Sequence, residues 1–220
     1  MKIRRKLILP GAIIIIIPIT VIGLFTIREA SDALKALEYE QLESRARDLA
    51  GGIDNVLTAE KKVVLGLASG SGMVNAVMRV ARDGREAAQD QLTDLRRELK
   101  RMAAAPGLKE YYEAFVPLGV DGIVLVASNG TERLDLTGRD YYQGAIKGSV
   151  TIGTPVLSKA TSLPVIGIAA PVYLPDGTMG GIVAAIVKLE SLRALIEGAK
   201  TGKTGYAFMC DKNGIIIAHP

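Results

Sequence analysis

The stretch that decides the fold is LPVIGIAAPVYLPDGTMGGIVAAIVKL, residues 163–189. Two apolar runs, 163–174 and 179–189, flank Pro175-Asp176-Gly177. This tripeptide is typical of a tight turn, because aspartate bonds to its own backbone and glycine adopts positive φ without steric cost. Strands joined by so short a turn pair antiparallel. With the helical segments described next, they predict an α+β fold in which helices lie on one side of an antiparallel sheet.

Further elements extend from this hairpin in both directions. Short β-rich runs occur at 111–119, 122–128 and 154–159, and a final hairpin is predicted at 206–210 and 215–218. Helical patterns cover 28–68, 73–81, 85–105, 138–148 and 190–200. We therefore divide the chain into a basic tail (1–6), an apolar span (7–27), a long helix and helical segment (28–110), a sheet module (111–188), a linking helix and loop (189–205) and the opening hairpin of a second module (206–220).

The N-terminal apolar run predicts a membrane anchor. Residues 7–27 are 21 residues without a charge, and a helix of that length is ~32 Å long, enough for a ~30 Å hydrocarbon core. Pro10 and Pro18 are tolerated in membrane spans. The alternative is a cleaved signal peptide, which needs a short apolar core and a small-residue cleavage site. This run is long and passes directly into a helical pattern, which favours an uncleaved anchor.

The distribution of charge predicts the orientation of this anchor. Four basic residues, Lys2, Arg4, Arg5 and Lys6, precede the span, and no acidic residue occurs before Glu29. Without these four, 23 basic residues balance 23 acidic ones, so the net charge of +4 lies entirely at the N-terminus. The positive-inside rule places this end in the cytoplasm and the rest outside a bacterial inner membrane. The basic character therefore does not indicate a nucleic-acid partner.

The segment 28–68 predicts one long helix with a partner helix. Apolar residues follow a 3-4 alternation that Glu60 alone interrupts, which is the pattern of a coiled-coil or bundle seam. The seam positions are Tyr39, Leu42, Ala46, Leu49, Ile53, Val56, Val63 and Leu67. The partner is a second helix of the same chain or of a homodimer.

Several stretches together resemble the double Cache sensor domain of bacterial chemoreceptors. They are FVPLGVDGIVLVAS (115–128), GRDYYQGAIKG (138–148), the region 154–172, GGIVAAIVKLESL (180–192) and GKTGYAFMCDKNGIIIAHP (202–220). The resemblance runs from about residue 30 to 220. It implies a periplasmic long helix carrying two PAS-like α+β modules, of which the membrane-distal one binds the ligand. It also implies a second membrane span and a cytoplasmic part, coupled to methylation and the chemotaxis kinase, beyond residue 220.

The resemblance also implies a ligand-binding cluster. In amino-acid-binding members, the helix after the third strand begins with an arginine, one residue and two aromatics, matched here by Arg139, Tyr141 and Tyr142, with Tyr141 where tryptophan is usual. Arginine suits a carboxylate, a helix N-terminus favours an anion, and tyrosine offers an apolar wall with a polar tip. The alternative is that the tyrosines pack under the sheet and Arg139 pairs with a nearby aspartate, Asp135 or Asp140.

The sequence departs from the amino-acid binders at the positions that would hold an ammonium group. Val156 and Ser158 stand where a tyrosine and an aspartate are usual, and Ala185 stands where the last strand of the module carries an aspartate. We therefore expect a small organic anion as ligand, and not an amino acid. Ser158, Thr161 and Tyr173 are further candidates for the pocket rim.

Other functions have little support in the sequence. GAKTGKTG, residues 198–205, has three residues where a phosphate-binding loop needs four, and it follows a helix. His219 and Cys210 are the sole histidine and cysteine, so no internal disulfide, metal site or Ser/His/Asp set is expected. We predict no enzyme and no cofactor. The open alternatives are a sensor for a histidine kinase or cyclic-dinucleotide enzyme, and a membrane-anchored interaction protein.

Overall fold

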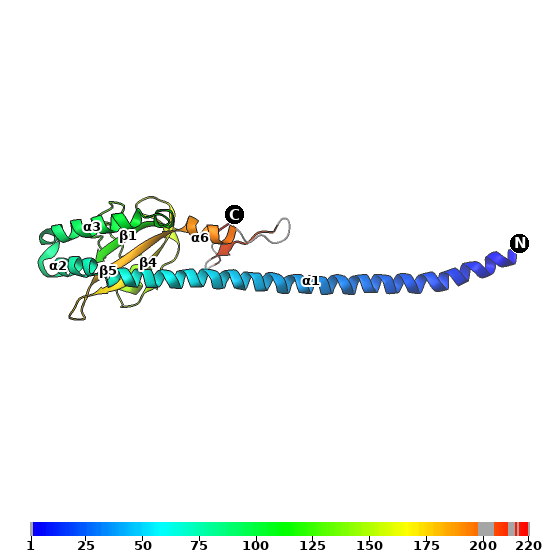
Figure 1. Cartoon of the computed structure of the whole chain (residues 1–220). Coiled ribbons are helices and arrows are strands. Elements are labelled where there is room, and N and C mark those ends of the chain that lie inside the picture. Colours follow the sequence, from blue (N-terminus) through cyan, green and yellow to red (C-terminus); the bar gives the residue numbers. More distant parts are fainter. Residues whose placement is uncertain (1, 198–204, 211–213, 215, 220) are drawn as a thin grey trace. The chain divides into compact units, whose positions relative to one another are not determined.

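The computed structural model describes residues 2–197, 205–210, 214 and 216–219, leaving aside the side chains of 2–14, 195 and 197. The chain forms two units, Met1–Leu49 and Ala50–Pro220. Figure 1 shows its helices and strands. The helices are α1 (Lys2–Ala68), α2 (Ser71–Ala87), α3 (Gln89–Ala103), α4 (Leu108–Tyr111), α5 (Asp140–Ala145) and α6 (Leu189–Glu197). Residues 198–204 of the predicted linking helix and loop (189–205) lie outside the described residues.

The predicted hairpin forms the centre of a five-stranded sheet. Its strands are β4 (Pro164–Tyr173) and β5 (Met179–Lys188), paired antiparallel from Val165↔Lys188 to Tyr173↔Met179. In the turn, the Asp176 carboxylate accepts hydrogen bonds from the Thr178 amide and hydroxyl, and Gly177 has a φ of 81°. β1 (Tyr112–Gly119) pairs with β5, while β2 (Thr151–Ile152) and β3 (Val156–Leu157) pair with β4. The α+β fold with an antiparallel sheet is therefore confirmed.

Both faces of the sheet are covered, whereas the sequence predicted helices on one side only. On one face, the C-terminal end of α1 packs with α2 and α3 against alternate residues of β4 and β5. We call this the helix face (Figure 1). On the opposite face, which we call the pocket face, α5 and the segment 120–139 cover the other residues of the same strands. Two separate cores result, because successive side chains of a strand point to opposite faces.

The run 122–128 is not a regular strand, contrary to the sequence prediction. It joins β1 by one isolated bridge, Leu118↔Val124, and by backbone hydrogen bonds such as that from the Leu125 amide to the Pro117 carbonyl at 2.9 Å. The Ser128 hydroxyl also accepts a hydrogen bond from the Phe115 amide at 3.0 Å. Its apolar residues are buried because they cover the edge of β1 and part of the pocket face. The apolar residues of this run correctly indicated that it is buried, but a buried run need not form a strand.

The face that α1 turns to the core agrees only in part with the heptad prediction, since the seam residues Val56 and Leu67 pack against the core of the helix face. Val64 and Ala68 are buried, whereas the predicted seam residue Val63 is 43% exposed. Glu60, read as a break in the seam, lies on the buried face and accepts a hydrogen bond from the Tyr112 hydroxyl. The buried positions follow the 3.6-residue period of a straight helix on a sheet rather than the 3.5-residue period of a coiled coil. In the unit 1–49, Tyr39 is exposed.

The two ends of the chain carry the predicted membrane span and the predicted final hairpin. Among the helices searched from Ile15 onward, none is by itself apolar enough over 18 residues to cross a bilayer, but Ile15–Ala68 and Ser71–Ala87, bent by 59°, pass the test as a pair. The side chains of residues 7–14 of the predicted span lie outside the description. The predicted final hairpin is present as β6 (Met209–Cys210), paired antiparallel with β7 (Ile216–Ala218).

Candidate ligand pocket

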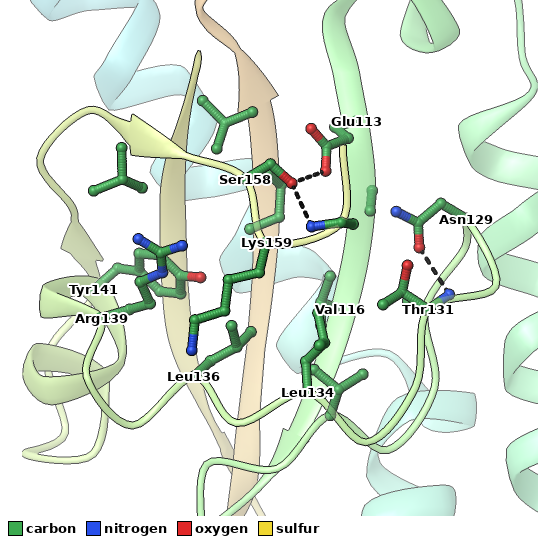
Figure 2. A pocket seen from close by; sticks show the side chains of 17 residues that line it. Glu113, Val116, Asn129, Thr131, Leu134, Leu136, Arg139, Tyr141, Ser158 and Lys159 are labelled. Carbon is green, nitrogen blue, oxygen red and sulfur yellow. Dashed lines mark hydrogen bonds between the residues drawn. The ribbon is translucent and has the colours of Figure 1, made fainter. Parts of the chain in front are cut away.

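A small cavity opens on the pocket face, between β1, α5 and the turn after β3 (Figure 2). Its volume is about 40 Å³, which corresponds to roughly three water positions at ~10–15 Å³ each. Most of the wall is apolar, from Val116, Leu134, Leu136 and Ile186 among others. The polar lining residues are Glu113, Asn129, Thr131, Arg139, Tyr141, Ser158 and Lys159. An apolar pocket with a few convergent polar groups is the usual form of a small-molecule site.

Arg139 brings a guanidinium group to this cavity. It is the N-cap residue of α5, with extended backbone (φ −88°, ψ 133°), and its side chain donates to the Leu157 carbonyl at 2.8 Å. Within the described part of the chain it forms no ion pair, so the predicted pairing with Asp135 or Asp140 is not found. A guanidinium carries five N–H donors, and one such bond leaves several for a carboxylate.

Asp140 lies at the start of α5, where the sequence predicted a favourable environment for an anion. The Asp140 carboxylate already accepts a hydrogen bond from the Tyr141 amide at 2.8 Å. Its second oxygen accepts bonds from the amide and hydroxyl of Thr154, each at 2.7 Å. One amide at the start of this short helix is therefore bonded within the protein. The charged side chain of Arg139 is a further source of attraction for a ligand anion.

Tyr141 forms one wall of the cavity, and two glycines make room for its ring. A Cβ atom at Gly167 would lie 2.8 Å from Cζ of Tyr141 and closer still to Cδ1 and Cε1. A Cβ atom at Gly153 would lie 2.9 Å from Cδ1. Burial raises the pKa of the Tyr141 hydroxyl to about 12, so the group is a neutral donor at physiological pH. The ring is fixed between two strands before any ligand enters.

Glu113 is one of four polar pocket residues that the sequence analysis missed, with Asn129, Thr131 and Lys159. It lies at the start of β1, and its carboxylate accepts a hydrogen bond from the hydroxyl of Ser158 at 2.5 Å (Figure 2). It also accepts one from the hydroxyl of Thr161 at 2.8 Å. The Ser158 hydroxyl also accepts a bond from the Ala160 amide, which holds the turn over the cavity. The available signal was a single acidic residue within the otherwise uncharged run 111–119. The cavity therefore contains an acid opposite its arginine.

Of the six predicted site residues, Arg139, Tyr141 and Ser158 line the cavity. Thr161 contacts it only through Glu113. Tyr142 and Tyr173 do not line the cavity, contrary to the prediction. The Tyr142 hydroxyl donates to the Val120 carbonyl at 2.7 Å, away from the cavity, and burial raises its pKa. Tyr173 is about half exposed at the far end of β4.

Of the three positions that we compared with the amino-acid binders, Val156, Ser158 and Ala185, one does not lie at the cavity. Val156 lines the cavity, as assumed. Ala185 belongs to the core of the helix face, and its neighbour Ile186 is the β5 residue that lines the cavity. β5 therefore brings an apolar side chain to the site, and the acid comes from β1 instead. Among the described residues, no group of three or more His, Cys, Asp or Glu side chains is placed to hold a metal ion.

Comparison with known proteins places this arrangement in a family. The Cache domain model matches residues 30–220, which is most of the chain. The chain belongs to the Cache domain family. The predicted resemblance is thereby confirmed, and the curated relatives of this Cache chain are methyl-accepting chemotaxis proteins. TlpB of Bacillus subtilis is 30% identical over 127 residues, covering 51% of this chain and 19% of the relative. PscA of Pseudomonas syringae pv. tomato is 22% identical over 219 residues, covering 98% of this chain and 32% of the relative.

Solved structures share the Cache fold at low sequence identity. The ligand-binding domain of the Campylobacter jejuni chemoreceptor Tlp3, in complex with 4-methylisoleucine, has a TM-score of 0.60 at 16% identity and covers 80% of this chain and 66% of that one. The sensor domain of the Vibrio cholerae histidine kinase DctB has a TM-score of 0.59 at 14% identity, covering 71% and 58%. Measured against the two curated relatives, TlpB and PscA, the chain spans about a fifth to a third of their length.

Proposed function

We propose that this chain is the ligand-sensing region of a transmembrane chemoreceptor and that its cavity binds a small molecule carrying a carboxylate. The anchor at 7–27 holds the region in the bacterial inner membrane, with the basic tail in the cytoplasm and the Cache modules in the periplasm. The family match and the methyl-accepting relatives support this assignment. Homodimerisation and contact with a chemotaxis kinase belong to the same proposal and involve the whole receptor.

The ligand proposal rests on the position of Arg139 and on its hydrogen bonding. Its guanidinium lines the cavity beside the Tyr141 ring and is held by one neutral acceptor, the Leu157 carbonyl. Because no described carboxylate pairs with it, a ligand carboxylate gains a charge-assisted, bidentate contact without displacing an internal partner. Tyr141 adds an apolar surface against the carbon skeleton of the ligand.

A specific observation favours a second candidate class, the amino acids. The expectation of a simple organic anion assumed that the pocket lacks a counter-charge for an amine, and Glu113 removes that assumption. A zwitterion would place its carboxylate at Arg139 and its ammonium group toward Glu113. The related chemoreceptor domains Tlp3 of C. jejuni and CtaA of Pseudomonas fluorescens were solved with 4-methylisoleucine and L-alanine respectively. Both candidates share the carboxylate contact with Arg139.

A thermal-shift screen with matched probes separates these candidates. Propionate carries only a carboxylate, ethylamine only an ammonium group, and L-alanine both. The order in which they stabilise the protein therefore shows which charged group the pocket binds. A rise in Tm with propionate and L-alanine but not with ethylamine supports the carboxylate site. Stabilisation by L-alanine alone assigns the site to amino acids, and stabilisation by ethylamine alone contradicts the proposal. Arg139→Ala is the matched variant, in which the carboxylate-dependent shift disappears.

Signalling follows from unequal affinity for two conformations. A ligand shifts the module only by the difference in its binding free energy between them. α1 receives that shift because its C-terminal end packs in the core of the helix face, and displacements of ~1–2 Å along interfaces are a known switching mode. Since the DctB sensor domain shares this fold, a histidine kinase output is the alternative for the whole protein.

A further inference from the structure

Two consecutive residues of β1 connect the cavity to α1. Glu113 lines the cavity and holds the turn after β3. Tyr112, its neighbour, is buried on the helix face, where its hydroxyl donates to the Glu60 carboxylate of α1. The Tyr112 ring also contacts Tyr111 and Phe115, with centroid separations of 4.9 and 4.7 Å. The pocket and the membrane-connected helix are therefore linked through a single peptide unit.

A β-bulge produces this arrangement. The pairing of β1 with β5 shifts between Tyr112↔Val187 and Ala114↔Ile186, which leaves Glu113 as the extra residue. Ala114 and Val116 face the pocket core and Phe115 faces the helix core. Regular alternation would place Tyr112 on the pocket face and Glu113 on the helix face. The bulge reverses both, because an extra residue changes which face the rest of the strand presents.

We infer that Glu113 and Tyr112 form a coupling element, in which the contacts of the Glu113 carboxylate in the cavity set the strength of the Tyr112–Glu60 bond to α1. This inference rests on the proposed ligand site, since it assigns a regulatory consequence to occupying it. A ligand donor group that draws Glu113 away from Ser158 and Thr161 pulls on the bulged residue. The adjacent Tyr112 then shifts on the opposite face of the strand, and its bond to Glu60 transmits the shift to α1.

The bond to Glu60 is suited to this role because it is buried and directional. Glu60 is the one acidic side chain of α1 among the buried residues of the described core, and burial is the first cause that raises the Tyr112 pKa, followed by the bond to Glu60. A buried acceptor that loses its partner costs far more than an exposed one. Small movements of Tyr112 are therefore translated into a change in how firmly α1 is held.

Hydrogen exchange measured by mass spectrometry on the whole 220-residue chain tests the inference without a ligand. Glu113→Gln keeps the shape of the side chain but weakens its bonds in the cavity. We expect the α1 segment 55–68 to exchange at least about fivefold faster in this variant, the lower end of usual coupling between sites. In a Tyr112→Phe background the bond to Glu60 is absent, so adding Glu113→Gln changes this rate by less than about twofold.

Two further variants keep the test independent of general destabilisation. Thr161→Val removes one bond to Glu113 from an exposed position and is expected to accelerate the same segment in the same direction. Ser128→Ala removes a buried bond to the Phe115 amide on the other edge of β1 and is expected to leave the segment 55–68 unchanged relative to the rest of the module.

The outcomes separate this inference from the proposed function. Equal effects of Glu113→Gln with and without Tyr112 overturn the coupling, as does an equal effect of Ser128→Ala. If propionate or L-alanine binds while α1 exchange ignores Glu113→Gln, the ligand site stands and the coupling fails. If exchange responds as expected but no probe binds, the coupling stands and the ligand assignment fails.

Discussion

Replacing Gly167 by alanine tests how Tyr141 is held in the cavity wall. The new Cβ atom would lie 2.8 Å from Cζ of Tyr141 and nearer to two other ring carbons, inside any real contact distance. The ring is 3% exposed, and the small cavity of about 40 Å³ that it lines is the space into which it could shift. Overpacking of this kind costs ~1–3 kcal/mol. We therefore expect a loss of about 2 kcal/mol in the free energy of unfolding, or roughly 4–8 °C in the Tm of the unit Ala50–Pro220.

The assay is urea unfolding followed by circular dichroism, with Gly138→Ala as the matched control. Nothing lies within 4 Å of a Cβ atom at Gly138, so this variant is expected within ~0.5 kcal/mol of the wild type. Adding Tyr141→Ala to Gly167→Ala removes the clashing ring. We therefore expect the double variant to lose less free energy of unfolding than the two single variants lose together. A Gly167→Ala protein as stable as the control, or fully additive losses, would refute the packing of Tyr141 on Gly167.

Three other predictions concern the core, the alkaline limit of stability and the turn over the cavity. Val64→Ala, at a fully buried position of α1, is expected to cost about 2 kcal/mol in urea unfolding, whereas Val63→Ala, at a 43% exposed position, costs less than ~1 kcal/mol; the opposite order would restore the heptad face. Because the folded pKa of Tyr141 is raised to about 12, the folded state holds the proton more tightly than the unfolded chain. Tyr141 should therefore contribute up to ~2 kcal/mol to the stability lost between about pH 10 and pH 12, in addition to the losses from Tyr111 and Tyr112, whose pKa values are also raised. Tyr141→Phe should lose correspondingly less than the wild type over this range, and an equal loss in both proteins would contradict the assignment. Ser158→Ala leaves Glu113 with one of its two hydroxyl partners and is expected to cost about 1 kcal/mol; no change in unfolding free energy would show that the turn is not held by this bond.

The sequence predicted the central hairpin and the helices because each carries a local signal. Apolar runs on both sides of Pro175-Asp176-Gly177 allow almost no other structure, and both strands are buried on both faces as such runs require. The predicted face of α1 was right at Val56 and Leu67 and wrong at Val63, because 3.5- and 3.6-residue periods diverge slowly, and a buried acid at Glu60 looked like an interruption.

The site was only partly predictable, since two of its determinants are not local. Tyr141 and Tyr142 are consecutive on a short helix, so their side chains point in different directions, and only the position of α5 on the sheet decides which one reaches the cavity. Glu113 reaches the cavity because of a bulge in β1. A bulge depends on pairing with β5 and leaves no signature in the strand that contains it.

The most direct test of the account is the affinity of the cavity for a carboxylate with and without Arg139. Isothermal titration of propionate and L-alanine into the whole chain would compare the wild type, Arg139→Ala and, as control outside the cavity, Tyr142→Phe. We predict that Arg139→Ala weakens binding of the better probe by at least about fivefold, since Arg139 is only partly buried and lies between an exposed pair of ~1 kcal/mol and a buried pair of ~2 kcal/mol or more, while Tyr142→Phe leaves it within about twofold. Equal affinity in the wild type and Arg139→Ala would contradict the proposed ligand site.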